Sequence, residues 1–206
     1  MELRMIGRSG LKVSPLCLGG NVFGWTIDEK RSMELLDAFF GAGFNFIDTA
    51  DVYSTWVSGH QGGESEAIIG NWMKSRGNRA SVVIATKVGM EMGGQKGLSK
   101  AHILASVEGS LQRLQTHYID LYQSHKADPE TPIEETLAVY AELIAAGKVR
   151  AIGTSNYTTA QLAPHWRQAC ALTCRAMRAY SQNITSTPAR LTSKNLSPSV
   201  TSTASA

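Results

Sequence analysis

The chain has 206 residues, of which 43% are hydrophobic and 18% are charged, with a formal net charge of +3. This length and apolar fraction suit a folded domain with a packed core. No run of 18 apolar residues occurs, which excludes a membrane-spanning helix. The first residues lack the basic-then-apolar order of a secretory signal, so we expect a cytoplasmic protein. The three cysteines form no CxxC pair, so we expect neither a disulfide scaffold nor a zinc site.

Charge is unevenly distributed along the chain. Residues 1–142 hold all 17 acidic residues and 13 Lys and Arg, whereas residues 143–206 hold seven Lys and Arg and no acid. Of the last 36 residues 13 are Ser or Thr and only four are basic, which is too few for a phosphate-binding tract. We therefore expect no nucleic-acid partner. The division predicts a folded unit over 1–167 and a disordered Ser/Thr-rich segment over 168–206.

The first 160 residues alternate short apolar runs with longer helical patterns. A β-hairpin is predicted first, with strands over 3–6 and 11–13 around a turn at Arg8-Ser9-Gly10. Five strand candidates then recur about every 30 to 40 residues, roughly the length of a βαβ unit: 15–19, 44–49, 81–87, 118–125 and 149–155. The run Val82-Val83-Ile84-Ala85 is apolar throughout, which is typical of a parallel strand covered on both faces.

Helical signals lie between these strands. Asp28 can cap a helix that is stopped by Gly41, and Ser99 can cap another. The segment Thr131-Pro132-Ile133-Glu134 has the pattern of a capping box with proline at the first helical position. It predicts a helix that ends near Ala146.

Five βα repeats predict an α/β fold, which is either an open doubly wound sheet or a (β/α)8 barrel. The first βα junction reads Gly19-Gly20-Asn21-Val22-Phe23-Gly24, which is not the GxGxxG fingerprint of a dinucleotide-binding doubly wound fold. Polar residues cluster instead where strands end, and in a barrel all of these ends face the mouth at which the chemistry occurs. We therefore expect an incomplete (β/α)8 TIM barrel with five to six βα units.

Four polar residues near the predicted strand ends form a coherent proton-transfer group: Asp48, Tyr53, Lys87 and His125. Taken singly, Asp48 can cap a turn, Lys87 can end a strand in solvent, and His125 and Tyr53 can serve packing. Taken together, an ammonium stabilises the phenolate that a tyrosine leaves when it gives up its proton, and a carboxylate holds the ammonium in place. A histidine can donate a hydrogen bond to the same developing oxyanion. An alternative is a Schiff-base barrel with Lys87 as nucleophile.

Five motifs occur in order along residues 1 to about 166: FIDTADVY at 46–53, GESE at 63–66, IATK at 84–87, YIDLYQSH at 118–125 and GKVRAIGTSNY at 147–157. By these motifs the sequence resembles the aldo-keto reductase superfamily. The Gly-Gly-Asn of the first βα junction, followed by Phe23-Gly24, resembles bacterial members that are similar to voltage-gated potassium channel β subunits. The resemblance implies a (β/α)8 barrel that uses NADPH to reduce a small carbonyl substrate, an aldehyde or a ketone.

The resemblance also implies a role for each matching residue. Tyr53 corresponds to the general acid, Lys87 and Asp48 tune it, and His125 orients the carbonyl group. The pair Ser155-Asn156 would hold the nicotinamide carboxamide of NADPH. The oligomeric state stays unknown from the sequence.

The resemblance stops after about residue 167, where a sixth strand would follow. A shifted reading frame is one explanation, because codons for residues 179–183 can be chosen that read Leu-Gln-Pro-Glu in another frame, which looks like the family's sixth-strand segment. An ordinary disordered tail is the other explanation. Because the later strands carry most cofactor contacts in the family, the alternative function is a non-catalytic truncated barrel that binds no cofactor.

Overall fold

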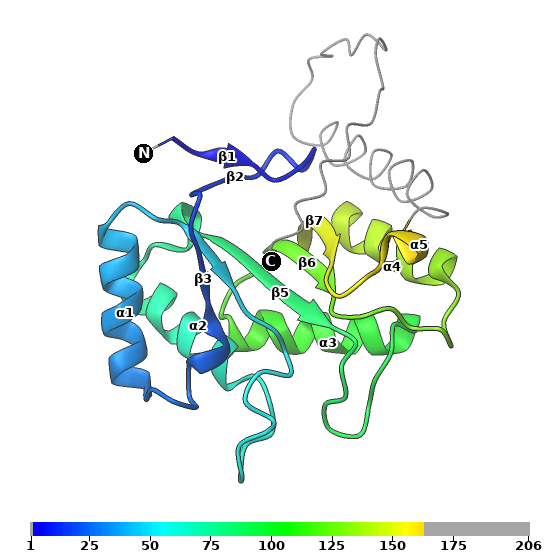
Figure 1. Ribbon diagram of the computed structural model, residues 1–206, viewed down its shortest axis with the longest axis horizontal. Coiled ribbons are helices and arrows are strands. Elements are labelled where there is room, and N and C mark those ends of the chain that lie inside the picture. The colour runs from blue at the N-terminus through cyan, green and yellow to red at the C-terminus, as the bar shows by residue number, and fades with distance from the viewer. Residues whose placement is uncertain (1, 163–206) are drawn as a thin grey trace, which may run out of the picture.

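The computed structural model describes residues 2–162 (Figure 1). The predicted boundary near residue 167 and the Ser/Thr-rich segment 168–206 lie outside the described residues. A short antiparallel hairpin of β1 (Arg4–Met5) and β2 (Lys12–Val13) comes first, as the sequence predicted. Its turn is closed by Ser9, whose hydroxyl donates to the carbonyl of Ile6 at 2.7 Å.

Among the described residues, the main sheet contains five parallel strands, each at a predicted position. They are β3 (Cys17–Gly19), β4 (Phe46–Asp48), β5 (Val83–Val88), β6 (Ile119–Ser124) and β7 (Val149–Thr154). Their order in the sheet follows the order in the chain. A doubly wound sheet reverses its strand order at a switch point, whereas sequential order with right-handed crossovers places the helices on one face, as in a barrel wall. The topology therefore agrees with the barrel, and residues 2–162 contain five of the predicted five to six βα units.

In the part of the chain that the structure describes, five helices alternate with these strands: α1 (Glu29–Gly41), α2 (Glu64–Arg76), α3 (Lys100–Arg113), α4 (Ile133–Ala145) and α5 (Thr159–Leu162). Short 3-10 turns, η1 (Gly20–Val22) and η2 (Arg79–Ser81), follow β3 and precede β5. Two predicted caps are confirmed, since Asp28 accepts from the N–H of Arg31 at 2.8 Å and Ser99 from that of His102 at 3.4 Å. Within residues 2–162, no helix has the length and apolar character needed to cross a membrane.

The third predicted cap is wrong. Pro132, and not Thr131, occupies the cap position before α4, and no side chain makes a capping hydrogen bond there. The hydroxyl of Thr131 donates instead to a carboxylate oxygen of Asp128 at 2.7 Å, and that oxygen also accepts from the N–H of Leu98 at 2.7 Å. Asp128 thus joins the loop before α3 to the loop before α4. The capping box fails because Pro132 and not Thr131 occupies the cap position, so the threonine lies one residue outside the place from which its oxygen could cap the helix.

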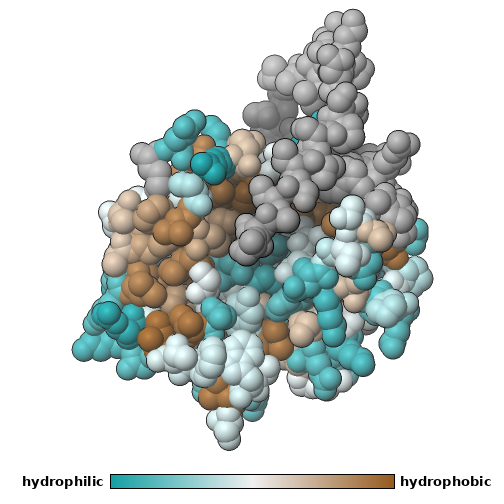
Figure 2. Space-filling view, in the orientation of Figure 1, coloured by the Kyte–Doolittle hydropathy of each residue, from teal (hydrophilic) through white to brown (hydrophobic). Residues whose placement is uncertain are grey.

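The core lies on both faces of the sheet. The larger cluster fills the space between the sheet and the helices and includes the fully buried Trp72 and Tyr122. A smaller cluster on the other face joins Leu11 of the hairpin end to Ala85 and Leu121 of the strands. Both faces of the strands are therefore covered, as the uninterrupted apolar run at 82–85 predicted for its strand. Figure 2 shows exposed apolar residues gathered along the side of the molecule that carries the hairpin, β3 and α1.

Candidate active site

The carboxyl ends of three neighbouring strands carry the predicted polar residues. Asp48 is the last residue of β4, Lys87 is the penultimate residue of β5, and His125 directly follows β6. The parallel register pairs Asp48 with Ala85 and Lys87 with Gln123, so these ends lie at one edge of the sheet. Parallel strands alone thus bring together residues that are up to 77 positions apart in the chain.

Lys87 is the centre of the group. Its ammonium nitrogen, Nζ, donates to Asp48 Oδ2 at 2.6 Å, to the backbone carbonyl of Thr49 at 2.7 Å and to the hydroxyl of Tyr53 at 2.9 Å. The Lys87 side chain is only 6% exposed. An ammonium has three hydrogens, and three acceptors surround it, so the cost of removing this charge from water is offset. The lysine is therefore a fixed positive charge in contact with the Tyr53 oxygen.

Asp48 has a second partner that the sequence analysis did not identify. Its other carboxylate oxygen, Oδ1, accepts from the side-chain amide of Gln123 at 3.3 Å. Gln123 lies on β6 opposite Lys87, two residues before His125. Its place inside the YIDLYQSH motif, on the same face of β6 as His125, is the signal that could have revealed it.

His125 lies beside Tyr53, with 6.0 Å between the ring centroids and 71° between the ring planes. Burial, and then the Lys87 ammonium, lower the pKa of His125 to about 4. The imidazole is therefore neutral near pH 7 and can donate one hydrogen bond while it carries no charge. Its Nδ1 atom is buried and has no hydrogen-bond partner among the described residues.

Ser155 and Asn156 follow β7 at the same edge of the sheet. The N–H of Ser155 donates to the carbonyl of Ser124 at 2.8 Å, which extends the β6–β7 pairing by one bond. The Asn156 side-chain N–H₂ donates to the carbonyl of His125 at 2.9 Å and to the Ser155 hydroxyl oxygen at 3.1 Å. The Ser155 hydroxyl hydrogen and the Asn156 amide oxygen then provide one donor and one acceptor. A carboxamide group requires this combination.

The GESE motif has a structural role that the sequence analysis did not assign. Ser65, at the start of α2, donates to the carbonyl of Gly20 at 2.7 Å and shares a hydrogen bond with the Thr49 hydroxyl at 2.8 Å. The fully buried Glu66 accepts from the Thr86 hydroxyl and, at 2.7 Å, from Arg113. These bonds hold Thr49, which follows Asp48, and Thr86, which precedes Lys87, against α2, and they join α2 to α3.

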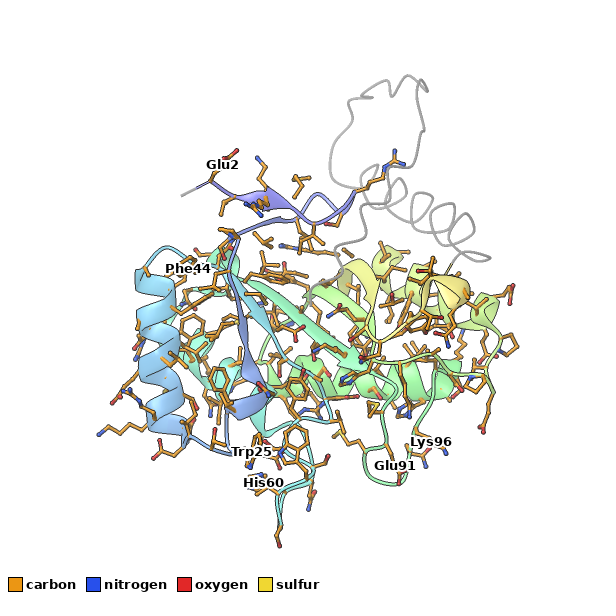
Figure 3. All side chains as sticks on the ribbon, viewed as in Figure 1. Glu2, Trp25, Phe44, His60, Glu91 and Lys96 are labelled. Atoms are coloured by element: carbon orange, nitrogen blue, oxygen red, sulfur yellow. The ribbon has the colours of Figure 1, made fainter. Side chains whose placement is uncertain are left out.

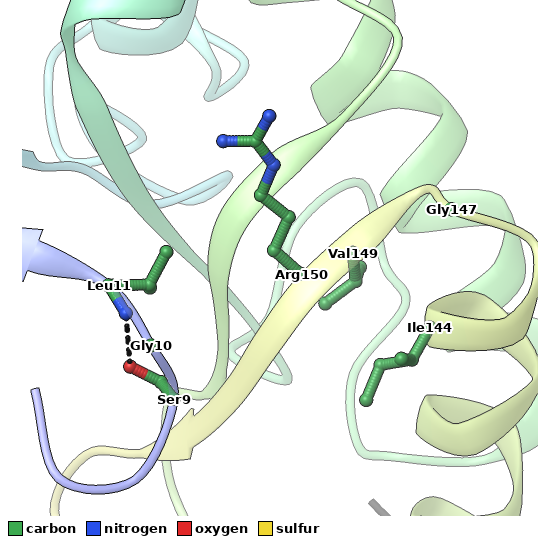
Figure 4. Close-up of a pocket in the computed structure, with 7 residues that line it drawn as sticks. All are labelled: Ser9, Gly10, Leu11, Ile144, Gly147, Val149 and Arg150. Carbon is green, nitrogen blue, oxygen red and sulfur yellow. Dashed lines mark hydrogen bonds between the residues drawn. The ribbon is translucent and has the colours of Figure 1, made fainter. Parts of the chain in front are cut away.

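Two cavities lie away from this group. One of about 380 Å³ lies between the hairpin and the start of β7, at the opposite end of the sheet (Figure 4). Its lining consists of Ser9, Gly10, Leu11, Ile144, Gly147, Val149 and Arg150. The other, of about 630 Å³, lies between the β4–α2 and β5–α3 loops. Neither cavity is lined by any of the six predicted site residues.

Comparisons with known proteins show what this chain is similar to. The model of the Aldo/keto reductase family matches residues 15–171. "Aldo-keto reductase YhdN" of Bacillus subtilis is 41% identical over 170 residues, covering 79% of this chain and 49% of that protein. A "Probable voltage-gated potassium channel subunit beta" of Oryza sativa subsp. japonica is 39% identical over 172 residues, covering 81% of this chain and 50% of that protein.

A solved structure is similar over the same part of the chain. It is the holo form of aldo-keto reductase AKR11C1 from Bacillus halodurans, with a TM-score of 0.70 and 34% identity over 81% of this chain and 54% of that one. The chain therefore spans about half the length of these three relatives. The described sheet and its helices correspond to part of a (β/α)8 barrel wall.

Proposed function

Because this chain belongs to the Aldo/keto reductase family, we propose that it is an NADPH-dependent reductase of small aldehydes or ketones with Tyr53 as general acid. One observation carries the proposal: the Lys87 ammonium touches the Tyr53 hydroxyl and the Asp48 carboxylate at the same time. This contact is the arrangement that a proton-donating phenol needs, since the phenolate that forms is met by a positive charge already in place.

Each residue then has one task as the carbonyl becomes an alcohol. When bound, NADPH supplies the hydride that the carbonyl carbon accepts. Tyr53 gives its hydroxyl proton to the carbonyl oxygen, and Lys87 stabilises the resulting phenolate. Asp48 holds Lys87 in position. The neutral His125 donates a hydrogen bond to the carbonyl oxygen and orients it toward Tyr53.

Ser155 and Asn156 are the residues that we assign to the nicotinamide carboxamide. They fit this group because they lie at the sheet edge beside His125 and combine a hydroxyl donor with an amide oxygen acceptor. The solved neighbour is a holo form, which supports a bound cofactor in this family.

Two alternative functions, a Schiff-base enzyme and a non-catalytic protein, require different properties of the chain. A Schiff-base nucleophile must be a neutral amine, whereas Lys87 is held as an ammonium by three acceptors, which argues against that chemistry. A non-catalytic protein that binds no cofactor is the other alternative. Titration of the chain with NADPH, followed by nicotinamide fluorescence, distinguishes this non-catalytic protein from the reductase, because only the reductase gives a saturable signal.

The catalytic assignment is tested by Tyr53→Phe, which removes one oxygen and keeps the ring. We expect carbonyl reduction to fall on the order of 10²–10⁴-fold, with NADPH affinity within a few-fold of the wild type. Tyr118→Phe is the matched control, because Tyr118 lies before β6 at the other end of the sheet. Retention of more than about a tenth of the wild-type turnover by Tyr53→Phe would exclude Tyr53 as the acid.

A further inference from the structure

A buried carboxyl group lies in the turn that joins Asp48 to Tyr53. It belongs to Asp51, which is 2% exposed and whose Oδ1 atom has no hydrogen-bond partner among the described residues. The proton transfer proposed above does not use this side chain. A buried carboxyl group without a partner is unfavourable when it carries a charge. The protonation state of Asp51 therefore matters to the turn that holds it.

The backbone of Asp51 fixes the turn that presents Tyr53. Its N–H donates to the carbonyl of Lys87 at 3.2 Å, and the N–H of Tyr53 donates to the carbonyl of Ala50 at 3.3 Å. Ser54, which follows Tyr53, is fully buried and has a φ of 80°, a left-handed conformation that is rare for residues other than glycine. Such a conformation persists only where the surrounding structure requires it. The contact between Tyr53 and Lys87 therefore depends on the packing at the buried side of this turn.

The buried side of the turn has fewer positive charges than carboxyl groups to pair with them. Glu66 of α2 is fully buried and is paired with Arg113, at the end of α3, 2.7 Å away. Lys87 is paired with Asp48. An ionised Asp51 would add a second buried negative charge near Glu66, and both nearby cations already have a carboxylate partner. A proton on Asp51 removes this imbalance.

The other titratable side chains around Asp51 are two tyrosines and the groups already paired. Tyr122 of β6 and Tyr140 of α4 are buried, and burial raises the pKa of each hydroxyl, so both stay neutral. Burial, and then the Glu66 carboxylate, raise the pKa of Asp51 to about 7. Asp51 is therefore the group in this cluster that exchanges a proton near neutral pH.

We propose that Asp51 is a positioning residue for Tyr53. Its neutral carboxyl group keeps the turn 50–53 packed, so that the Tyr53 hydroxyl lies against the Lys87 ammonium. When Asp51 loses its proton to solvent, the uncompensated charge draws water to the turn, and Tyr53 moves away from Lys87. The chain thus holds its proton donor in place in acidic solution and releases it in alkaline solution. The effect on carbonyl reduction rests on the function proposed above, whereas the movement of the turn does not.

Trp56 reports the position of this turn without cofactor or substrate, because its ring lies 6.0 Å from that of Tyr53. The test follows the indole N–H resonance of Trp56 by NMR, assigned by its absence in Trp56→Phe. For the wild-type chain we expect this resonance to shift between about pH 5 and pH 9 with a midpoint near 7. Asp51→Asn should remove the shift and keep the position seen in acidic solution, because an amide cannot ionise.

Two further variants identify the titrating group. Figure 3 shows His60 on the same loop, and histidine changes its charge in the same pH range, so His60→Gln is the control and should leave the midpoint unchanged. Glu66→Gln should move the midpoint to lower pH, because it removes the negative charge near Asp51 and frees the Arg113 guanidinium. The proposal is overturned by any one of four results: no shift in the wild type, a shift that survives Asp51→Asn, its loss in His60→Gln, or an unchanged midpoint in Glu66→Gln.

The pH dependence of kcat connects the turn to the proposed reaction. For the wild type, kcat should fall about tenfold between about pH 6 and pH 8, as does the neutral fraction of a group with a midpoint near 7. Asp51→Asn should keep kcat within about twofold over the same range. A titrating indole without turnover would support the control of the turn by Asp51 and contradict the reductase assignment. Turnover by the wild type with the same kcat at both pH values would overturn the role of Asp51 and leave the reductase assignment intact.

Discussion

Asp51 lies three residues beyond Asp48, yet its environment is very different. The residue is 2% exposed, and its Oδ1 atom has no hydrogen-bond partner among residues 2–162. Burial, and then the nearby Glu66 carboxylate, raise the pKa of Asp51 to about 7 from its ordinary value of 3.8. The folded chain therefore keeps a proton that the unfolded chain loses. The stability that this proton provides is complete below about pH 4 and is lost as the pH rises through about 7.

Asp51→Asn should remove this dependence, because an amide has nearly the same shape and cannot ionise. We expect the thermal midpoint of the variant to fall less than that of the wild type between about pH 5 and pH 8. Circular dichroism at several pH values measures it. Asp37→Asn is the control and should keep the wild-type trend, since hydrogen bonds from Arg76 and Trp72 lower the pKa of Asp37 to about 2. A fall in Asp51→Asn as large as that of the wild type would show that Asp51 is ionised when folded.

At the scale of elements, α2 and the end of α3 approach unusually closely. A Cβ atom built on Gly70 of α2 would overlap the carbonyl oxygen of Arg113 and the backbone of Leu114. Backbone atoms cannot turn aside as a flexible side chain can. The close approach also lets Arg113 reach Glu66 on α2, 2.7 Å away, and this ion pair joins the two helices that support the site.

Gly70→Ala should therefore separate the helices and destabilise the fold by about 1–3 kcal/mol. Gly41→Ala, at the end of α1, is the matched control, because a Cβ there meets nothing within 4 Å. The control should be neutral or slightly stabilising, since alanine is the better helix former. Urea unfolding followed by circular dichroism gives both values. Equal effects of the two substitutions would contradict the close packing of α2 on α3.

At the scale of the whole molecule, the end of the sheet opposite the site holds the strands together. The buried carboxylate of Asp120 on β6 accepts from the N–H of Ile84 on β5 at 3.0 Å, and it lies 2.8 Å from both Arg79 and Arg150. Both guanidinium groups lie 3.9 Å from the centre of the Tyr118 ring. One side chain thus joins β5, β6 and β7 far from Tyr53. This division is general in barrels, where stability and chemistry lie at opposite ends.

Asp120→Ala should lower the free energy of unfolding by about 3 kcal/mol, because it leaves the partly buried Arg79 without its carboxylate. Glu34→Ala is the control, since it breaks an exposed ion pair with Arg31 and should cost less than about 1 kcal/mol. Denaturant unfolding compares the two variants. A cost for Asp120→Ala no greater than that of the control would mean that this cluster does not stabilise the sheet.

Local interactions made the strands, two helix starts and the meeting of three site residues predictable from the sequence alone. Short apolar runs placed all five strands, and the uninterrupted run at 82–85 indicated a strand covered on both faces, which needs no polar alternation. Asp28 and Ser99 marked helix starts, because a cap is a contact within one turn. The spacing of Asp48, Lys87 and His125 predicted that they would meet, because the ends of parallel strands share one edge.

Contacts between distant residues were decided only by the tertiary structure. The sequence did not predict helix α2, because seven of its 13 residues are buried and its apolar residues therefore form no single stripe. Thr131 lies outside the cap position and donates to Asp128, which also accepts from Leu98, 30 positions away. The edge-to-face ring pair of Trp25 and Trp56 and the bond from Ser54 to Phe23 join the same two loops, 31 positions apart in the chain. Such contacts leave no local periodicity, because their geometry exists only once separate βα units have packed together.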